Sequence, residues 1–154
     1  LRRQMARNFR RPLIIMSPKS LLRHARAVSP VEDLSGARFH EVLDDPNPPE
    51  KIQRLVFCSG KIFYDLLEYR EAERVRDVAL VRMEQFYPFP DSPMKRMREQ
   101  YGGAREIIWA QEESKNRGGW AFMVPRLMEN FPDRFIRYVG RRASASPARA
   151  RSWR

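Results

Sequence analysis

The sequence predicts an α/β fold in which a mainly parallel sheet is covered by helices. Apolar runs typical of buried strands occur at residues 55–58, 78–81 and 107–110. Segments with helical spacing or with helix-ending residues separate these runs, so strands and helices alternate along the chain. Alternation at these lengths is typical of βαβ units, in which the strands are parallel and the crossovers right-handed.

The N-terminal part of the chain predicts shorter elements. Residues 11–17 contain an apolar run, 12–16, that begins at a proline, which predicts a buried strand over 11–17. Residues 20–26 are expected to form a short helical turn, and residues 27–38 a polar connection. Side chains alternate over 39–44, as in a short edge strand, and three prolines make 44–50 a loop.

The rest of the chain predicts alternating strands and helices. Strands are expected at 52–59, 77–83, 105–111 and 135–139, and helices at 61–75, 91–101 and 120–130. The first of these helices carries an apolar stripe with helical spacing at Ile62, Leu66, Tyr69 and Ala72. The second is expected to be capped by Asp91 or Ser92 and to end at Gly102-Gly103.

The charge of the chain is unevenly distributed. Its 154 residues carry a formal net charge of +11, which raises the possibility of nucleic-acid binding. However, residues 1–12 and 141–154 each hold five arginines and no acid, and the body between them carries 20 basic and 19 acidic residues. A basic nucleic-acid binder would need both ends to form one patch. The nearly neutral body therefore argues against that function.

Several simpler features also restrict the function. Cys58 is the single cysteine, which excludes an internal disulfide, and its apolar neighbours predict an inert buried thiol. With only His24 and His40 available, a zinc site is not expected, and no apolar run approaches the roughly 20 residues of a membrane span. Because an arginine-rich start at Leu1 runs directly into an apolar segment, we expect an internal cut in a longer chain, with 149–154 an irregular basic tail.

Polar residues follow the predicted strands, where ligands of parallel sheets usually bind. Gly60 and Lys61 join a strand to a helix whose first N–H groups suit a phosphate, although a structural turn is the alternative. Ser20 and Arg23 lie beyond the first predicted strand and suit an anionic ligand, unless Ser20 only caps a helix.

Two further sites were considered in the second half of the chain. Arg82, at a strand end, suits a bidentate phosphate or carboxylate, or else pairs with an internal acid such as Glu84 or Glu112. Glu112 and Glu113 form a carboxylate pair in sequence. Adjacent strand residues point to opposite faces, so no catalytic acid–base pair is expected there.

Read together, five ordered blocks resemble one known family. They are residues 9–24, 54–66, 77–90, 109–120 and 138–148, and include Ser-Pro-Lys-Ser-Leu-Leu-Arg-His at 17–24. The blocks resemble the decarboxylating, thiamine-diphosphate-dependent component of 2-oxoglutarate dehydrogenase. The 17–24 block favours this family over transketolase or pyruvate dehydrogenase, which share its fold.

The resemblance implies a transketolase-type C-terminal domain over residues 1–148, without catalytic or metal-binding residues of its own. Other domains of the same chain would bind thiamine diphosphate and magnesium. The full enzyme would be a homodimer of the bacterial cytoplasm or mitochondrial matrix. It would decarboxylate 2-oxoglutarate and pass a succinyl group to the lipoyl arm of the dihydrolipoyl succinyltransferase component.

Matched motif by motif, the resemblance also implies an effector site. Ser20, Arg23, Lys61 and Arg82 would hold the phosphates of acetyl-CoA or AMP. The alternative is a stand-alone module that binds an acyl-CoA or a nucleotide without catalysis. The chain departs from the family after residue 148, and Arg117 stands where a glutamine is expected. Both departures put dimer contacts near them in doubt.

Overall fold

The computed structural model describes residues 8–9, 11–12, 14, 18–35 and 39–146. The chain divides into two units, Leu1–His40 and Glu41–Arg154, and each is described here by itself. The first unit contains the 3-10 helix η1 (Leu21–Arg23) and the short helix α2 (Glu32–Ser35). The helical turn expected at 20–26 is thus present in shorter form.

Two segments of the first unit were predicted to be a strand and a polar connection. The strand expected at 11–17 lies largely outside the described residues, and residues 11, 12 and 14 are not in a strand. The connection expected at 27–38 contains the turn of α2, where Ser35 N donates to the Val31 carbonyl at 3.3 Å. Glu32 is the first residue of this helix, where negative charge favours a helix.

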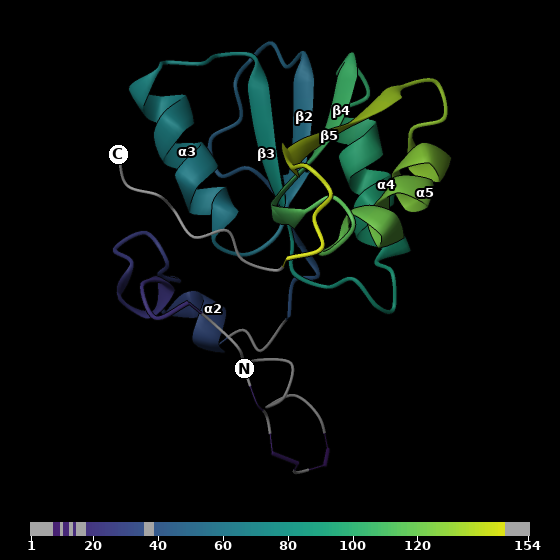
Figure 1. Ribbon diagram of the computed structural model, residues 1–154. Coiled ribbons are helices and arrows are strands. Elements are labelled where there is room, and N and C mark those ends of the chain that lie inside the picture. Colours follow the sequence, from purple (N-terminus) through teal and green to yellow (C-terminus); the bar gives the residue numbers. More distant parts are fainter. Residues whose placement is uncertain (1–7, 10, 13, 15–17, 36–38, 147–154) are drawn as a thin grey trace, which may run out of the picture. The chain divides into compact units, whose positions relative to one another are not determined.

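The second unit is built on one five-stranded sheet. Its elements are β1 (Val42–Leu43), β2 (Arg54–Cys58), α3 (Ile62–Ala72), β3 (Val78–Met83), α4 (Asp91–Gln100), β4 (Glu106–Ser114), α5 (Trp120–Asn130) and β5 (Phe135–Arg141). The strand order is β1-β3-β2-β4-β5, with only the edge strand β1 antiparallel among these pairs (Figure 1). The predicted α/β class with a mainly parallel sheet is confirmed.

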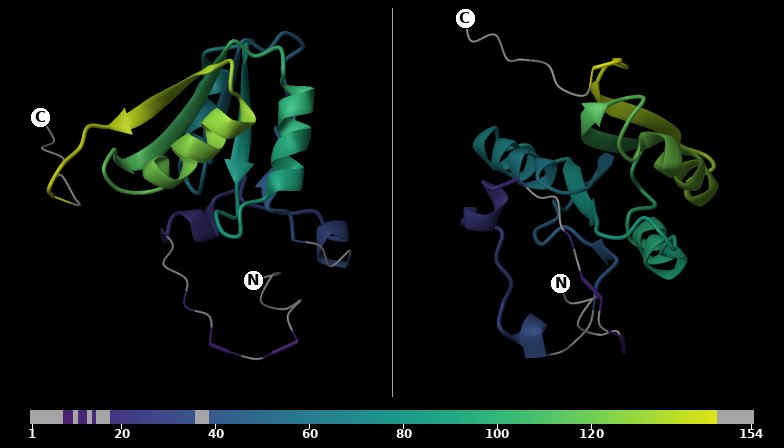
Figure 2. Two further views of the ribbon diagram at one scale, coloured as in Figure 1. Left: turned by 90° about the vertical axis from the view of Figure 1, so that its right-hand side faces the viewer. Right: turned by 60° about the horizontal axis from the view of Figure 1, so that its bottom comes forward.

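The helices cover the sheet from both sides. Figure 2 shows α3 on one side of the strands and α4 and α5 on the other. The order explains this placement, because the chain moves from β2 to β3 in one direction and from β3 across β2 to β4 in the other. Right-handed crossovers in opposite directions put their helices on opposite faces.

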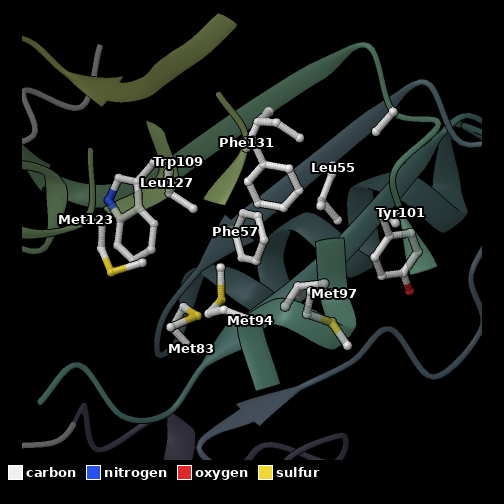
Figure 3. Close-up of a cluster of buried hydrophobic side chains, with 14 residues drawn as sticks. Leu55, Phe57, Met83, Met94, Met97, Tyr101, Trp109, Met123, Leu127 and Phe131 are labelled. Atoms are coloured by element: carbon white, nitrogen blue, oxygen red, sulfur yellow. The ribbon is translucent and has the colours of Figure 1, made fainter. Parts of the chain in front are cut away.

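The core lies between the sheet and the pair α4 and α5. It is formed by alternate residues of the strands and by the inner faces of the helices, among them Leu55, Phe57, Val81, Met83, Met94, Met97, Ile107, Trp109, Met123 and Leu127. Figure 3 shows Phe57 facing Phe131, and their ring centroids are 5.9 Å apart. The central strands are buried on both faces, which explains why they appear in the sequence as continuous apolar runs.

The stripe expected on α3 is wrong. Tyr69 is 64% exposed, and the buried residues of this helix are Phe63, Tyr64 and Arg70. Helical spacing alone allowed both stripes, because Phe63 and Arg70 are also separated by two turns. An apolar pattern does not predict that an arginine faces inward. Arg70 faces inward because it binds a buried acidic partner.

That partner is Asp45, in the loop expected at 44–50. Arg70 donates from both terminal nitrogens to the Asp45 carboxylate, and Nη1 also donates to the Val78 carbonyl at 3.1 Å. The Asp45 side chain is fully buried and also accepts from Leu80 N at 2.8 Å. This buried ion pair joins the loop, α3 and β3.

The ends of two elements also differ from expectation. Helix α4 begins at Asp91 with Pro90 as its cap residue, and no side-chain hydrogen bond caps it, so neither Asp91 nor Ser92 has the expected role. Strand β4 extends to Ser114, three residues beyond the expected end at 111, with an irregular register against β5 between Ala110 and Ser114.

Candidate functional site

Arg82 lies near the carboxyl end of β3, where it is held by three neighbours. Its guanidinium carbon is 4.6 Å from the Phe63 ring centroid, and Nη1 donates to the Tyr64 hydroxyl at 2.8 Å. Its Nε is 2.7 Å from Glu84 Oε1, although this buried nitrogen has no well-directed hydrogen bond. Because the two atoms are close but poorly aligned for a hydrogen bond, the contact is an ion pair without a directional hydrogen bond. Internal pairing with Glu84, the alternative considered for Arg82, is therefore realised.

Lys61 immediately precedes α3 and is also paired. Its Nζ is 2.5 Å from Asp65 Oδ2, one helical turn away, and 3.4 Å from Glu112 Oε1 on β4. The hydrogen bond to Asp65 raises the pKa of Lys61, which keeps the ammonium charged. These exposed pairs are easily exchanged for another anion, because exposed ion pairs contribute only about 0–1 kcal/mol.

Lys61 and Arg82 belong to the same edge of the sheet. Cys58, near the end of β2, is in register with Arg82 on β3 and with Ala110 on β4. The three strands are parallel, so their carboxyl ends meet at one edge. Gly60 makes the turn into α3 there with a positive φ of 73°, which accounts for a glycine at this position.

Ser20 and Arg23 belong to the other unit. Both are exposed, and Ser20 is the cap residue of η1 without a side-chain capping hydrogen bond. The Ser20 carbonyl accepts from Arg23 N at 3.3 Å. The structure thus describes Ser20 and Arg23 within the first unit, and Lys61 and Arg82 within the second.

Cys58 has the character expected from its neighbours. It is fully buried, and burial raises the pKa of its thiol to about 12. Its Sγ donates to the Val81 carbonyl at 3.8 Å. The predicted burial of Cys58 is confirmed, and a thiol held protonated in this way is a poor nucleophile.

Gln111 is the organising polar residue that the sequence did not reveal. It is 4% exposed, and its Oε1 accepts from Trp109 Nε1 at 2.8 Å and from Trp120 N at 2.9 Å. Its Nε2 donates to the Arg117 carbonyl at 2.7 Å and to the Ser114 carbonyl at 3.1 Å. Gln111 thereby connects the core to the loop between β4 and α5.

Two glycines allow this loop to approach Gln111. Gly118 has a positive φ of 65°, and a Cβ there would lie 3.0 Å from Gln111 Nε2. A Cβ on Gly119 would lie 2.6 Å from Trp109 Cζ2. In the sequence, the signal for this arrangement was the Gly-Gly pair at 118–119, shortly after the predicted strand 105–111 that ends in glutamine.

Two classes of feature are absent from the residues that the structure describes. In those parts of the chain, no group of three or more His, Cys, Asp or Glu side chains is placed to hold a metal ion. Within the same ranges, no helix has the length and apolarity needed to cross a membrane.

Residues 28–152 match the family described as 2-oxoglutarate dehydrogenase C-terminal. Over 151 residues the chain is 46% identical to a 2-oxoglutarate dehydrogenase E1 component of Cupriavidus necator. It is 48% identical over 157 residues to a mitochondrial 2-oxoglutarate dehydrogenase of Caenorhabditis briggsae. It is 44% identical over 153 residues to a probable 2-oxoadipate dehydrogenase complex component E1 homolog of Dictyostelium discoideum.

Each of these matches covers 96% of this chain but only 15–17% of the relative. The chain thus corresponds to a small part of much longer proteins. The family match extends over most of the chain, and two of these three relatives carry the same enzyme name. The chain therefore belongs to the 2-oxoglutarate dehydrogenase C-terminal family.

Proposed function

We propose that this chain is the C-terminal domain of a 2-oxoglutarate dehydrogenase E1 component. The observation that carries the proposal is 46% identity, over nearly the whole chain, to an E1 component named for this activity. The full enzyme would decarboxylate 2-oxoglutarate and transfer the succinyl group to the lipoyl arm of a dihydrolipoyl succinyltransferase component. It would act in the bacterial cytoplasm or the mitochondrial matrix.

Within that enzyme, the domain would have a structural and regulatory role. Residues 1–148 would form a transketolase-type C-terminal domain that supports a homodimer, followed by the basic tail 149–154. Thiamine diphosphate and magnesium would be held by other domains and would supply the decarboxylation chemistry. The buried thiol of Cys58 and the paired charges of Lys61 and Arg82 fit this division, since none of these three side chains is placed to act as a nucleophile or a base.

The proposal is tested by comparing the isolated chain with the longer protein that contains it. With thiamine diphosphate and Mg²⁺, the longer protein is expected to release CO₂ from 2-oxoglutarate and the isolated chain to release none. The same assay with 2-oxoadipate is the control for specificity, because one relative carries that name. Turnover by the isolated chain, or a clear preference for 2-oxoadipate, would contradict the proposal.

We further propose that the carboxyl edge of the sheet contributes to an effector site for a phosphate ester such as acetyl-CoA or AMP. Lys61 and Arg82 supply two cations at that edge, and both are held by carboxylates that an anionic ligand could replace. Ser20 and Arg23 belong to the first unit, and their part in effector binding stays a prediction from the resemblance. Arg82 offers the best-defined geometry, because its aromatic neighbours orient the guanidinium.

Replacing Arg82 with alanine in the longer protein is expected to weaken binding of acetyl-CoA or AMP by about 1.5–3 kcal/mol, the usual range for a charged hydrogen bond. Calorimetric titration measures this directly. Arg54→Ala is the matched control, because Arg54 lies at the amino end of β2 and pairs with Asp77 at 2.8 Å. Equal affinity of wild type and Arg82→Ala would show that Arg82 does not bind the effector. No binding by the wild type would contradict the proposed effector site as a whole.

A further inference from the structure

The segment that follows β5 is held by side chains of the loop between β4 and α5. Asn116 Nδ2 donates to the Ser144 carbonyl at 3.1 Å, and Ser144 N donates back to Asn116 Oδ1 at 3.0 Å. Arg117 Nη2 donates to the Ala145 carbonyl at 2.9 Å. The Asn116 side chain therefore offers one donor and one acceptor to the backbone of one residue, as a neighbouring strand would.

The loop that carries these side chains is itself fixed independently of the segment. Gln111 binds the carbonyls of Ser114 and Arg117 from the core side, and Arg117 N donates to the Ser114 carbonyl at 2.8 Å. Lys115 N also donates to the carbonyl of Arg141, the last residue of β5, at 3.0 Å. The loop thus presents Asn116 and Arg117 in a defined position to residues 143–146.

The two sets of contacts differ in burial. Gln111 is buried, whereas Asn116, Arg117 and the backbone groups of residues 144–145 that they bind form exposed contacts. Exposed hydrogen bonds exchange readily with water and each contributes little net stability, whereas buried groups lose their partners at a larger cost. The outer contacts can therefore open while the inner ones stay closed.

From this difference we propose that residues 115–117 form a clasp for residues 143–146. The segment would detach and rebind as a unit on the surface of the sheet, without opening of β4 or of the loop. Asn116 contributes most to the clasp because its side chain binds both the N–H and the carbonyl of Ser144. Arg117 adds a contact to the next residue, Ala145. The clasp gives the end of the sheet two states that differ in the exposure of residues 143–146.

The test is hydrogen exchange of the full chain, read at single amides by NMR. In Asn116→Ala, the Ser144 amide is expected to exchange about tenfold faster, as expected for loss of roughly one hydrogen bond. In Asn116→Asp, which keeps the acceptor for Ser144 N, that amide is expected to keep most of its protection. Arg117→Ala should speed exchange over residues 143–146 without the same focus on Ser144.

Asn130→Ala is the matched control, since the Asn130 side chain donates to the Arg126 carbonyl within its own helix. It should leave residues 143–146 unchanged. Amides of Ile107 to Ala110 report the sheet and should be unaffected in every clasp variant. The proposal is overturned if Asn116→Ala and Arg117→Ala both leave exchange over 143–146 unchanged. It is equally overturned if the sheet amides accelerate to the same extent, because the segment then opens only with the sheet.

Discussion

Replacing Arg70 with methionine is expected to lower the free energy of unfolding by about 3–5 kcal/mol, because it leaves the Asp45 carboxylate charged and buried without its partner. The Asp45 side chain is fully buried, and both terminal nitrogens of Arg70 bind it. Methionine keeps most of the side-chain volume, so the loss reports the charge rather than a cavity. Urea unfolding followed by tryptophan fluorescence measures the change.

Two comparison variants separate the buried charge from a general effect of losing an arginine. Arg54→Met removes the pair with Asp77, whose side chains are 42% and 35% exposed, and should cost about 1 kcal/mol or less. Adding Asp45→Asn to Arg70→Met removes the stranded charge while keeping an oxygen for Leu80 N, and should recover part of the loss. Equal losses for Arg70→Met and Arg54→Met would contradict this account.

The Asp45–Arg70 pair also illustrates what the sequence could not predict. Strands β2, β3 and β4 were predicted because each is an apolar run buried on both faces. The orientation of α3 was not, since its spacing allowed two stripes and the decisive contact joins residues 25 positions apart. A periodic pattern reports local geometry, whereas a pair of opposite charges becomes inward-facing only when the fold brings the two partners together.

The same distinction between local pattern and long-range contact applies to the candidate site. Lys61 and Arg82 were expected at strand ends, and parallel pairing alone puts them at one edge of the sheet. The choice of Glu84 as the partner of Arg82 depends on side-chain geometry, and the sequence left Glu84 and Glu112 as equal alternatives. The importance of Gln111 was not predicted either, because it comes from the burial of an uncharged amide, which the sequence does not show.

Replacing Gln111 with methionine is expected to lower the free energy of unfolding by about 3 kcal/mol, because several buried polar groups lose their partner at once. Trp109 Nε1 and Trp120 N lose their acceptor, and the carbonyls of Ser114 and Arg117 lose a donor. Each orphaned buried group costs about 1–3 kcal/mol, and partial access of water to the loop carbonyls keeps the total below the sum. Chemical denaturation again provides the measurement.

Gln85→Met is the control, because the Gln85 side chain makes an exposed bond to the Pro88 carbonyl and should change stability by about 0.5 kcal/mol or less. Gln111→Met should also accelerate hydrogen exchange over more residues than Asn116→Ala does. With the inner contacts gone, amides of residues 115–117 and of residues 143–146 should exchange faster together, whereas Asn116→Ala should affect only the second group. If Gln111→Met frees residues 143–146 while the loop stays protected, then the loop does not depend on Gln111. Continued protection of residues 115–117 in Gln111→Met would therefore contradict this prediction.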